Sequence, residues 1–321
     1  MRIDTPCSSK RHTYALPVTA ARIGLVLGAG GPVGHAFHAG VVRALHESLS
    51  WDARDAAVVV GTSAGAQVGA LLRAGMSSDD VAARASGRPL TAAGDAIARH
   101  YTRPNHDAPR GESAYKPSSP QYLKRVMRRP WTARLGPLVS ALLPEGHVPM
   151  HTQAHGLKRV FGDCWPVRHL WITAVHLESG SRVAFGAPGA PKTDVGTAVS
   201  CSGAVPGICQ PVLVDDRRYV DGGIFSPTHL DLLGEEKLDL VIVSSPLSMF
   251  APMRLLLRAE MKSLAQRGVR SVAFEPKGPV LRAMGLNPMA LWRSARVAHA
   301  AYEHTRSEVA SLVMRPLRDA L

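Results

Sequence analysis

The chain has 321 residues, of which 45% are hydrophobic and 20% charged, and its net charge is +13. This composition is that of a globular protein and excludes a mainly disordered chain. No uninterrupted apolar run reaches the roughly 18 residues of a membrane-spanning helix, and residues 1–20 hold no continuous apolar segment of the signal-peptide kind. We therefore expect neither a membrane span nor a signal peptide.

The spacing of the cysteines indicates the redox environment in which the protein is expected to reside. Cys7, Cys164, Cys201 and Cys209 show no C-x-x-C spacing, which argues against a zinc site and against a disulfide framework. The expected location is therefore a reducing cytoplasm, with peripheral placement at the inner membrane surface if the positive charge serves lipid binding.

Two basic stretches suggest a negatively charged partner. Nucleic acid is not expected, because zinc-finger spacing and RNP-type aromatic motifs are missing and aromatic residues make up only 5% of the chain. Peripheral contact with an anionic membrane surface is the other candidate, since each basic side chain near such a surface adds roughly 1 kcal/mol. A merely solvated basic face is the alternative. The stretches are Lys124, Arg125, Arg128, Arg129 and Arg134 around Trp131, and Arg254, Arg258 and Lys262 at four-residue spacing.

The first regular elements surround a glycine-rich segment. Residues 1–20 are polar and turn-rich and are expected to form a flexible arm, and residues 22–27 read as a short buried strand. Gly28 to Gly34 is expected as a tight loop, and apolar residues then return at helical spacing from His35 to Leu49. Backbone N–H groups at a helix N-terminus bind negative charge, so this loop is a candidate anion site.

Two kinds of anion fit such a loop. A dinucleotide pyrophosphate requires an acidic residue at the end of the next strand, but that strand, Val58 to Val60, ends in Gly61-Thr62-Ser63. A P-loop requires Gly-Lys-Ser/Thr after the glycines, and none follows. The sequence therefore predicts no cofactor. The other anion is the oxyanion of an acyl-transfer intermediate, which the amides of Gly30 and Gly31 would bind.

The second strand leads into the pattern G-x-S-x-G. Gly61 and Gly65 flank Ser63 between this strand and a helix that begins near Ala66, as in a nucleophile elbow. The glycines allow strand and helix to pass close to each other. Loops after neighbouring parallel strands emerge at one sheet edge, so Ser63 and the Gly28–Gly31 loop are expected to face one another. An ordinary glycine-rich turn is the alternative.

Later segments add one acidic residue at a strand end. A short helix is expected at residues 79–85, and residues 87–150 have a weak pattern typical of a functional excursion or lid. Within them, residues 135–143 form an apolar patch that suits either interfacial contact or a packed cap helix. Strands are expected at 170–175, 181–185 and 217–220, and a helix at 193–201. The last of these strands leads into Asp221-Gly222-Gly223, which alone reads as a hairpin turn.

Taken together, these motifs resemble the patatin-like phospholipase family. They occur in the family's order and span residues 23–245, where residues 240–243 look like a later core strand. The matching segments are Leu25-Val26-Leu27-Gly28-Ala29-Gly30-Gly31 with Gly34 and the following helix, Gly61-Thr62-Ser63-Ala64-Gly65, residues 200–207, and Tyr219-Val220-Asp221-Gly222-Gly223.

The resemblance implies a fold and a set of site residues. The fold would be a three-layer α/β/α domain with a central mostly parallel sheet and a lid-like insertion. The domain would cover residues 21–321, with its core at about 23–245, the insertion at about 87–150 and C-terminal helices at about 250–313. Ser63 would be the nucleophile and Asp221 its partner, with Gly222 and Gly223 completing the D-G-G motif. Gly28, Gly30 and Gly31 would form the oxyanion hole.

The implied activity is hydrolysis of lipid esters, phospholipids or acylglycerols, without metal or cofactor. Asp is a weak base, so Asp221 should be desolvated and its pKa raised. Val33 stands where the family usually has a basic residue, and Ala29 where a glycine is common, which leaves an inactive lipid-binding or scaffold protein as one alternative. A Ser-His-Asp triad using His229, His299 or His304 is another. His35 and His38 share a helix face, but a metal site there lacks a third ligand.

Overall fold

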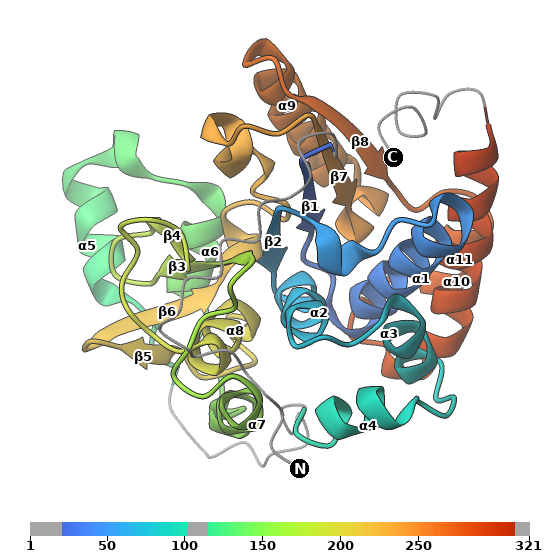
Figure 1. Ribbon diagram of the computed structural model, residues 1–321. Coiled ribbons are helices and arrows are strands. Elements are labelled where there is room, and N and C mark those ends of the chain that lie inside the picture. Colours follow the sequence, from blue (N-terminus) through green and yellow to red (C-terminus); the bar gives the residue numbers. More distant parts are fainter. Residues whose placement is uncertain (1–20, 102–114, 312–321) are drawn as a thin grey trace.

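Eight strands form one sheet in the part of the chain that the computed structural model describes, residues 21–101 and 115–311 (Figure 1). Five central strands, β3, β2, β1, β7 and β8, run parallel, and β4, β5 and β6 are antiparallel additions beside β3. The predicted mostly parallel α/β sheet is confirmed. The strands are β1 Ile23–Leu27, β2 Val58–Thr62, β3 His169–His176, β4 Arg182–Phe185, β5 Val212–Val214, β6 Arg217–Asp221, β7 Leu240–Ser244 and β8 Arg270–Phe274.

Helices surround this sheet (Figure 1). The α-helices are α1 Gly31–Leu49, α2 Ala64–Arg73, α3 Ser78–Ala85, α4 Ala92–Ala98, α5 Pro120–Arg128, α6 Leu135–Leu142, α7 His151–Phe161, α8 Val195–Gly203, α9 Ala251–Gln266, α10 Pro279–Met284 and α11 Ser294–Ala310. The 3-10 turns are η1 Ala53–Asp55, η2 Pro130–Thr132, η3 Gly222–Ile224, η4 Leu230–Glu235, η5 Pro246–Met249 and η6 Leu291–Arg293. The expected arm, residues 1–20, lies outside the described residues.

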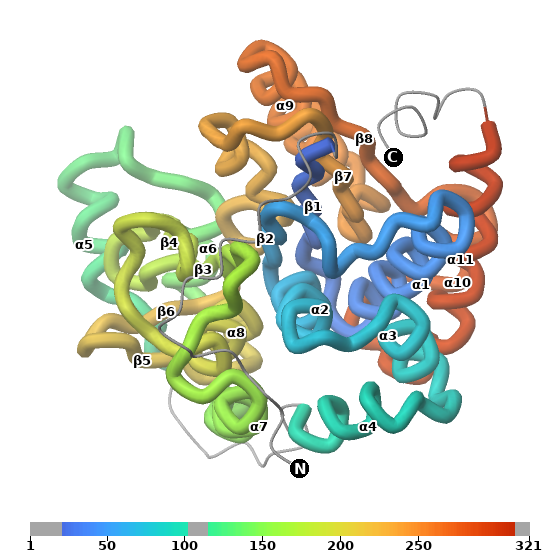
Figure 2. Tube along the Cα trace, in the orientation of Figure 1, coloured from blue at the N-terminus to red at the C-terminus, as the bar shows by residue number. Residues whose placement is uncertain are grey.

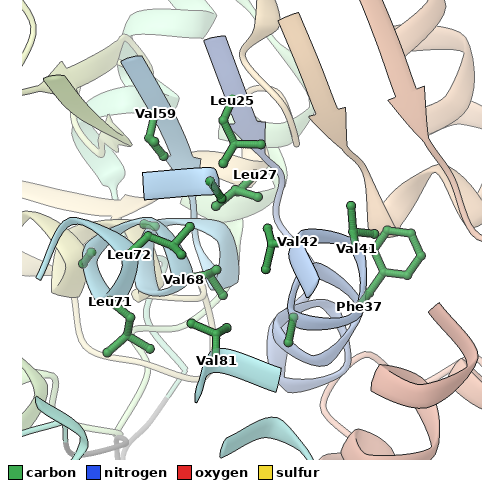
Figure 3. Close-up of a cluster of buried hydrophobic side chains, with 14 of the residues drawn as sticks. Leu25, Leu27, Phe37, Val41, Val42, Val59, Val68, Leu71, Leu72 and Val81 are labelled. Carbon is green, nitrogen blue, oxygen red and sulfur yellow. The ribbon is translucent and has the colours of Figure 1, made fainter. Parts of the chain in front are cut away.

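Neighbouring residues of a strand point to opposite faces of the sheet. In the parallel strands both sets of side chains are buried. Leu25 and Leu27 of β1 contact α1 and α2, whereas Val26 belongs to a second cluster with Leu257 and Leu264 of α9. Figure 3 shows the first cluster, in which side chains from β1, β2, α1, α2 and α3 converge. Burial on both faces explains why these strands read as continuous apolar runs and not as alternating ones.

The C-terminal helices pack on the domain. Helix α11 lies along α1 (Figure 2), and the two backbones approach so closely that a Cβ on Gly40 would lie 2.4 Å from the carbonyl oxygen of Ala298. Helix α9 packs on η4 and β8. No helix among the described residues combines the length and apolar character needed to cross a bilayer.

Strand β3 aligns β2 with β6. β2 pairs with residues 169–173 of β3, and β6 pairs with residues 174–176. β4 pairs with residues 172–175, overlapping both. A strand has only two hydrogen-bonding flanks, so β4 occupies one flank while β2 and β6 share the other. β2 is parallel and β6 antiparallel to β3, and their carboxyl ends therefore meet.

Two expectations need correction. The glycine segment is not a loop as far as Gly34, because α1 begins at Gly31, with Gly30 at the N-cap and Pro32 in the first turn. Proline suits this position because its missing N–H needs no partner there. Cys164 is disulfide-bonded, whereas Cys201 and Cys209 are free and buried. The spacing of the cysteines therefore gives no argument for a reducing compartment.

Candidate active site

Ser63 occupies a strained turn between β2 and α2. Its backbone angles are φ 54° and ψ −115°, a conformation that non-glycine residues rarely adopt and that is often found at functional sites. Its amide donates a hydrogen bond of 2.8 Å to Oγ of Ser202 in α8. A Cβ on Gly65 would lie 1.9 Å from the carbonyl oxygen of Leu27, so only glycine lets α2 pass this close to the end of β1. The serine is thus held at the edge where β1 and β2 end.

Asp221 lies against Ser63. An interaction with the Ser63 side chain lowers the pKa of its carboxyl, and its Oδ1 accepts a 2.7 Å hydrogen bond from the amide of Gly223. Asp221 is only 5% exposed. Burial raises the pKa of the Asp221 carboxyl to about 6, although the bonds from Ser63 and Gly223 favour the charged form. The expected rise in this pKa is therefore confirmed, with desolvation as its main cause.

The glycine segment lies beside this pair. A Cβ on Gly223 would lie 3.0 Å from the Cβ of Ala29, so the β1–α1 segment and the D-G-G turn are in close proximity. Gly31 has φ +60°, which favours glycine. Among the described backbone groups of turns, loops and caps, neither Gly30 nor Gly31 donates its amide to a carbonyl. Both amides are candidate donors to an oxyanion.

Gly28 cannot serve as the third donor. Its amide donates to the carbonyl oxygen of Ser244 at 3.0 Å, so its assignment to the oxyanion hole is corrected to a structural role. Val33 is buried in the core, and its amide donates to the carbonyl oxygen of Pro288. The position that is usually basic in the family is thus an apolar core position here.

Two buried histidines, His38 and His229, donate hydrogen bonds to backbone carbonyl oxygens beside the candidate site. The acceptors are Gly28 in the segment between β1 and α1 and Gly222 in the turn after β6. Nε2 of His38 lies 2.8 Å from the oxygen of Gly28, and Nδ1 lies 2.7 Å from Oγ of Ser244. A carbonyl can only accept, so Nε2 of His38 carries the proton and Nδ1 accepts from the serine. His229 does the same for the other loop, with Nε2 at 3.0 Å from the oxygen of Gly222.

Burial keeps both rings neutral. Desolvation lowers the pKa of His38 and the pKa of His229 to about 4 in each case. The Arg182 guanidinium, 3.5 Å from Nδ1 of His229, acts in the same direction. Each imidazole is therefore a fixed donor to one loop carbonyl above about pH 5, and His229 is committed to Gly222.

The other proposed histidines lie away from the pair. His299 is exposed on α11 and lines a surface cavity with Arg43 and Tyr302, and His304 pairs with Glu308 at 3.5 Å. Within residues 21–101 and 115–311, no group of three or more His, Cys, Asp or Glu side chains is arranged to hold a metal ion.

Some of these contacts could not be expected from local pattern. Ser202, Ser244 and the roles of His38 and His229 were not predicted, although residues 200–207 were singled out. Their partners lie far away along the chain: 139 positions separate Ser63 from Ser202, and 206 separate His38 from Ser244. Of these residues, only Ser244 has a local signal, because it is a polar residue at the carboxyl end of the apolar strand β7.

A serine in a strained strand-to-helix turn, with a buried carboxylate against it and two glycine amides beside it, belongs to the nucleophile-elbow class of α/β proteins. The model of the patatin-like phospholipase family matches residues 25–233, more than half of the chain. The chain therefore belongs to the patatin-like phospholipase family, as the motifs suggested. This membership supports a lipid hydrolase function.

The solved structures that are similar to this chain share little sequence with it. The crystal structure of VipD from Legionella pneumophila is 14% identical with a TM-score of 0.42, and the alignment covers 89% of this chain and 66% of that one. The type III effector protein ExoU is 18% identical with a TM-score of 0.37, at 91% and 54% coverage. This chain thus spans less than two-thirds of either protein. A search of curated proteins gave no match.

Proposed function

We propose that the protein is a serine acyl hydrolase that cleaves ester bonds of phospholipids or acylglycerols through Ser63 and Asp221. The observation that carries this proposal is the burial of both side chains at the point where β2 and β6 meet end to end on β3, with the Asp221 carboxyl at a pKa of about 6. A base with this pKa is ionised at neutral pH and is a better proton acceptor than an exposed aspartate. Family membership supports the substrate class.

The first half-reaction acylates Ser63. Its Oγ attacks the ester carbonyl carbon while Asp221 accepts the hydroxyl proton, and the carbonyl electrons move onto oxygen. The Gly30 and Gly31 amides donate to this oxyanion, each contributing about 3 kcal/mol of transition-state stabilisation by analogy with other oxyanion holes. When the intermediate collapses, the bond to the alcohol breaks, and the alcohol oxygen takes the proton from Asp221.

The second half-reaction releases the acid. Asp221 accepts a proton from water as the water oxygen attacks the acyl carbon, and the same two amides hold the second oxyanion. Collapse breaks the bond to Oγ, which recovers the proton from Asp221. The free fatty acid leaves, and both side chains return to their starting state.

A p-nitrophenyl ester series of increasing acyl length, together with a phospholipid, tests the proposal. We expect turnover that Ser63→Ala reduces to background and that alanine at His229, His299 or His304 does not abolish. Turnover that survives Ser63→Ala would contradict the proposal. Lipid binding without Ser63-dependent turnover on any ester would instead favour a binding protein, the alternative motivated by Ala29 and Val33.

A further inference from the structure

The segment from residue 115 to residue 144, which we call the α5–α6 face, carries charge of one sign. It contains six basic residues and no Asp or Glu, and among the described residues none of the six pairs with a carboxylate within 4.0 Å. The second basic stretch differs, because Arg254 and Arg258 both pair with the buried Glu275. The six residues are Lys116, Lys124, Arg125, Arg128, Arg129 and Arg134.

Large apolar side chains gather on the same segment. Seven of the thirteen exposed large hydrophobic residues in the described chain lie on this face, so the exposure is concentrated and not scattered. Leu135, Val139 and Leu142 repeat at helical spacing and form one exposed side of α6, while its other side is buried. The seven are Tyr115, Met127, Trp131, Leu135, Val139, Leu142 and Leu143, with Trp131 and Leu135 each 79% exposed.

A surface cavity of about 700 Å³ lies between this face and the β3–β4 turn. Arg125, Arg134 and Arg182 line it together with Trp131 and Phe225. Guanidinium groups bind phosphate oxygens well, and the aromatic rings offer an apolar wall. This lining suits an amphipathic molecule with a phosphate group.

The α5–α6 face contacts the turn that follows Asp221. A Cβ on Gly136 of α6 would lie 1.7 Å from the carbonyl oxygen of Ile224 in η3, so the helix backbone rests directly on η3. The Arg134 guanidinium lies 4.2 Å from the centre of the Phe225 ring, which stacks on His229. In Figure 1, α5 lies at the left edge of the molecule. A surface that binds this face is brought next to the candidate active site.

We infer that the α5–α6 face docks the protein on the surface of an anionic lipid bilayer. The inference rests on the proposed function, because a lipid ester hydrolase meets its substrate in a bilayer. The six basic side chains attract anionic headgroups, and the exposed apolar side of α6 enters the interface, as in other interfacial helices. Nucleic acid would satisfy the charges but offers no comparable apolar layer for Leu135, Val139 and Leu142.

Vesicle co-sedimentation of the full chain carrying Ser63→Ala tests the docking without hydrolysis of the lipid. We expect binding to vesicles of phosphatidylcholine mixed with phosphatidylglycerol, weak binding to phosphatidylcholine alone, and loss of binding at high salt. The triple change Lys124→Ala, Arg128→Ala and Arg129→Ala should weaken binding by about 100-fold, at about fivefold per charge. Trp131→Ala should weaken it by about tenfold.

Matched changes elsewhere are the controls. Lys237→Ala, Lys262→Ala and Arg270→Ala remove the same charge from exposed positions outside this face, and Trp292→Ala removes a tryptophan that is 78% exposed. Both controls should bind within about fivefold of the parent. Equal loss in the two triple variants, or equal binding to neutral and anionic vesicles, would overturn the inference. So would tighter binding to a duplex oligonucleotide that the same face mediates.

The experiments distinguish a failure of the docking proposal from a failure of the proposed hydrolase function. If the parent hydrolyses a soluble short-chain ester through Ser63 but the two triple variants bind vesicles alike, the docking face is wrong and the hydrolase stands. If vesicle binding follows the expected pattern but no ester is cleaved, the hydrolase is wrong and the docking face stands. Unchanged thermal unfolding midpoints of the variants show that the fold is retained.

Discussion

Thr62 and Asp221 lie opposite adjacent residues of β3, Thr173 and Ala174, on the same flank of that strand. β2 arrives parallel to β3 and β6 arrives antiparallel, so the two chains meet end to end at this point. The residue after Thr62 is Ser63, which therefore lies against Asp221. Strand register, and not a flexible loop, brings the hydroxyl and the carboxylate together.

Activity should depend on the ionised form of Asp221. Because the pKa of its carboxyl is about 6, we expect kcat/KM to rise about tenfold per pH unit below pH 6 and to level off above pH 7. Asp221→Asn should lower kcat by about 10²–10⁴-fold, the usual contribution of a general base. Asp163→Asn, at an exposed position that pairs with Lys158, is the control. A pH-independent rate between pH 5 and pH 7 would contradict this role.

The same substitution should stabilise the fold at alkaline pH. The folded-state pKa of Asp221 is raised above its ordinary value of 3.8, so its contribution to stability is fully present below pH 3.8 and is lost as the pH rises through about 6. Asn stays neutral and can still accept from the Gly223 amide. We expect Asp221→Asn to gain roughly 1–3 kcal/mol at pH 8. Urea denaturation at pH 8 and pH 4 measures this, and the gain should shrink at the lower pH.

His38 should act on turnover by holding the glycine segment. His38→Phe fills the space but leaves the Gly28 carbonyl and the Ser244 hydroxyl without their partner, which costs about 1–3 kcal/mol of stability. Small displacements of catalytic groups lower rates by up to about 10²-fold, so kcat should fall about 10–100-fold with little change in KM.

His38→Gln provides the rescue test, because its amide can donate to the Gly28 carbonyl. It should recover most of the rate, and His299→Phe on the exposed face of α11 should have no effect. A fall in stability without a fall in kcat, measured by steady-state kinetics on a soluble ester, would assign His38 a structural role only.

Gly65 should tolerate no side chain. The Cβ of Gly65→Ala would meet the backbone oxygen of Leu27 at 1.9 Å, and a backbone group cannot rotate away. We expect a loss of more than about 3 kcal/mol in the free energy of unfolding, or failure to fold. Gly203→Ala in α8 would meet only the ends of side chains, the nearest being Met150 Cε at 3.2 Å, and should change stability by less than about 1 kcal/mol. Urea denaturation of both variants makes the comparison.

The local sequence was sufficient to predict a strand and its end where an apolar run leads directly into a turn motif. The run Val58 to Val60 followed by Gly61-Thr62-Ser63 predicts both the strand and the residue at which it ends. Asp221 follows its strand in the same way. Six of the eight strands, most of the long helices and the family could therefore be predicted, whereas β5 and β8 were not expected. The start of α1 could not, because Gly30-Gly31-Pro32 has the composition of a loop while Pro32 also suits a first helical turn.

Contacts between distant segments could not be predicted. That the Gly28 amide is occupied depends on where β7 ends, since its acceptor is Ser244. Whether the basic residues of α9 are free depends on Glu275, which follows β8. The apolar repeat of α6 could be predicted, but which of its sides is exposed depends on its packing against η3.

Because β2 and β6 are aligned through β3, the position of Ser63 relative to Asp221 depends on the register of these three strands. Every strand that aligns Ser63 with Asp221 lies outside residues 87–150, so the register of the reacting pair is set without strand pairing from this stretch. A shift of two residues in the β3–β6 pairing, by contrast, would separate the pair by about 7 Å.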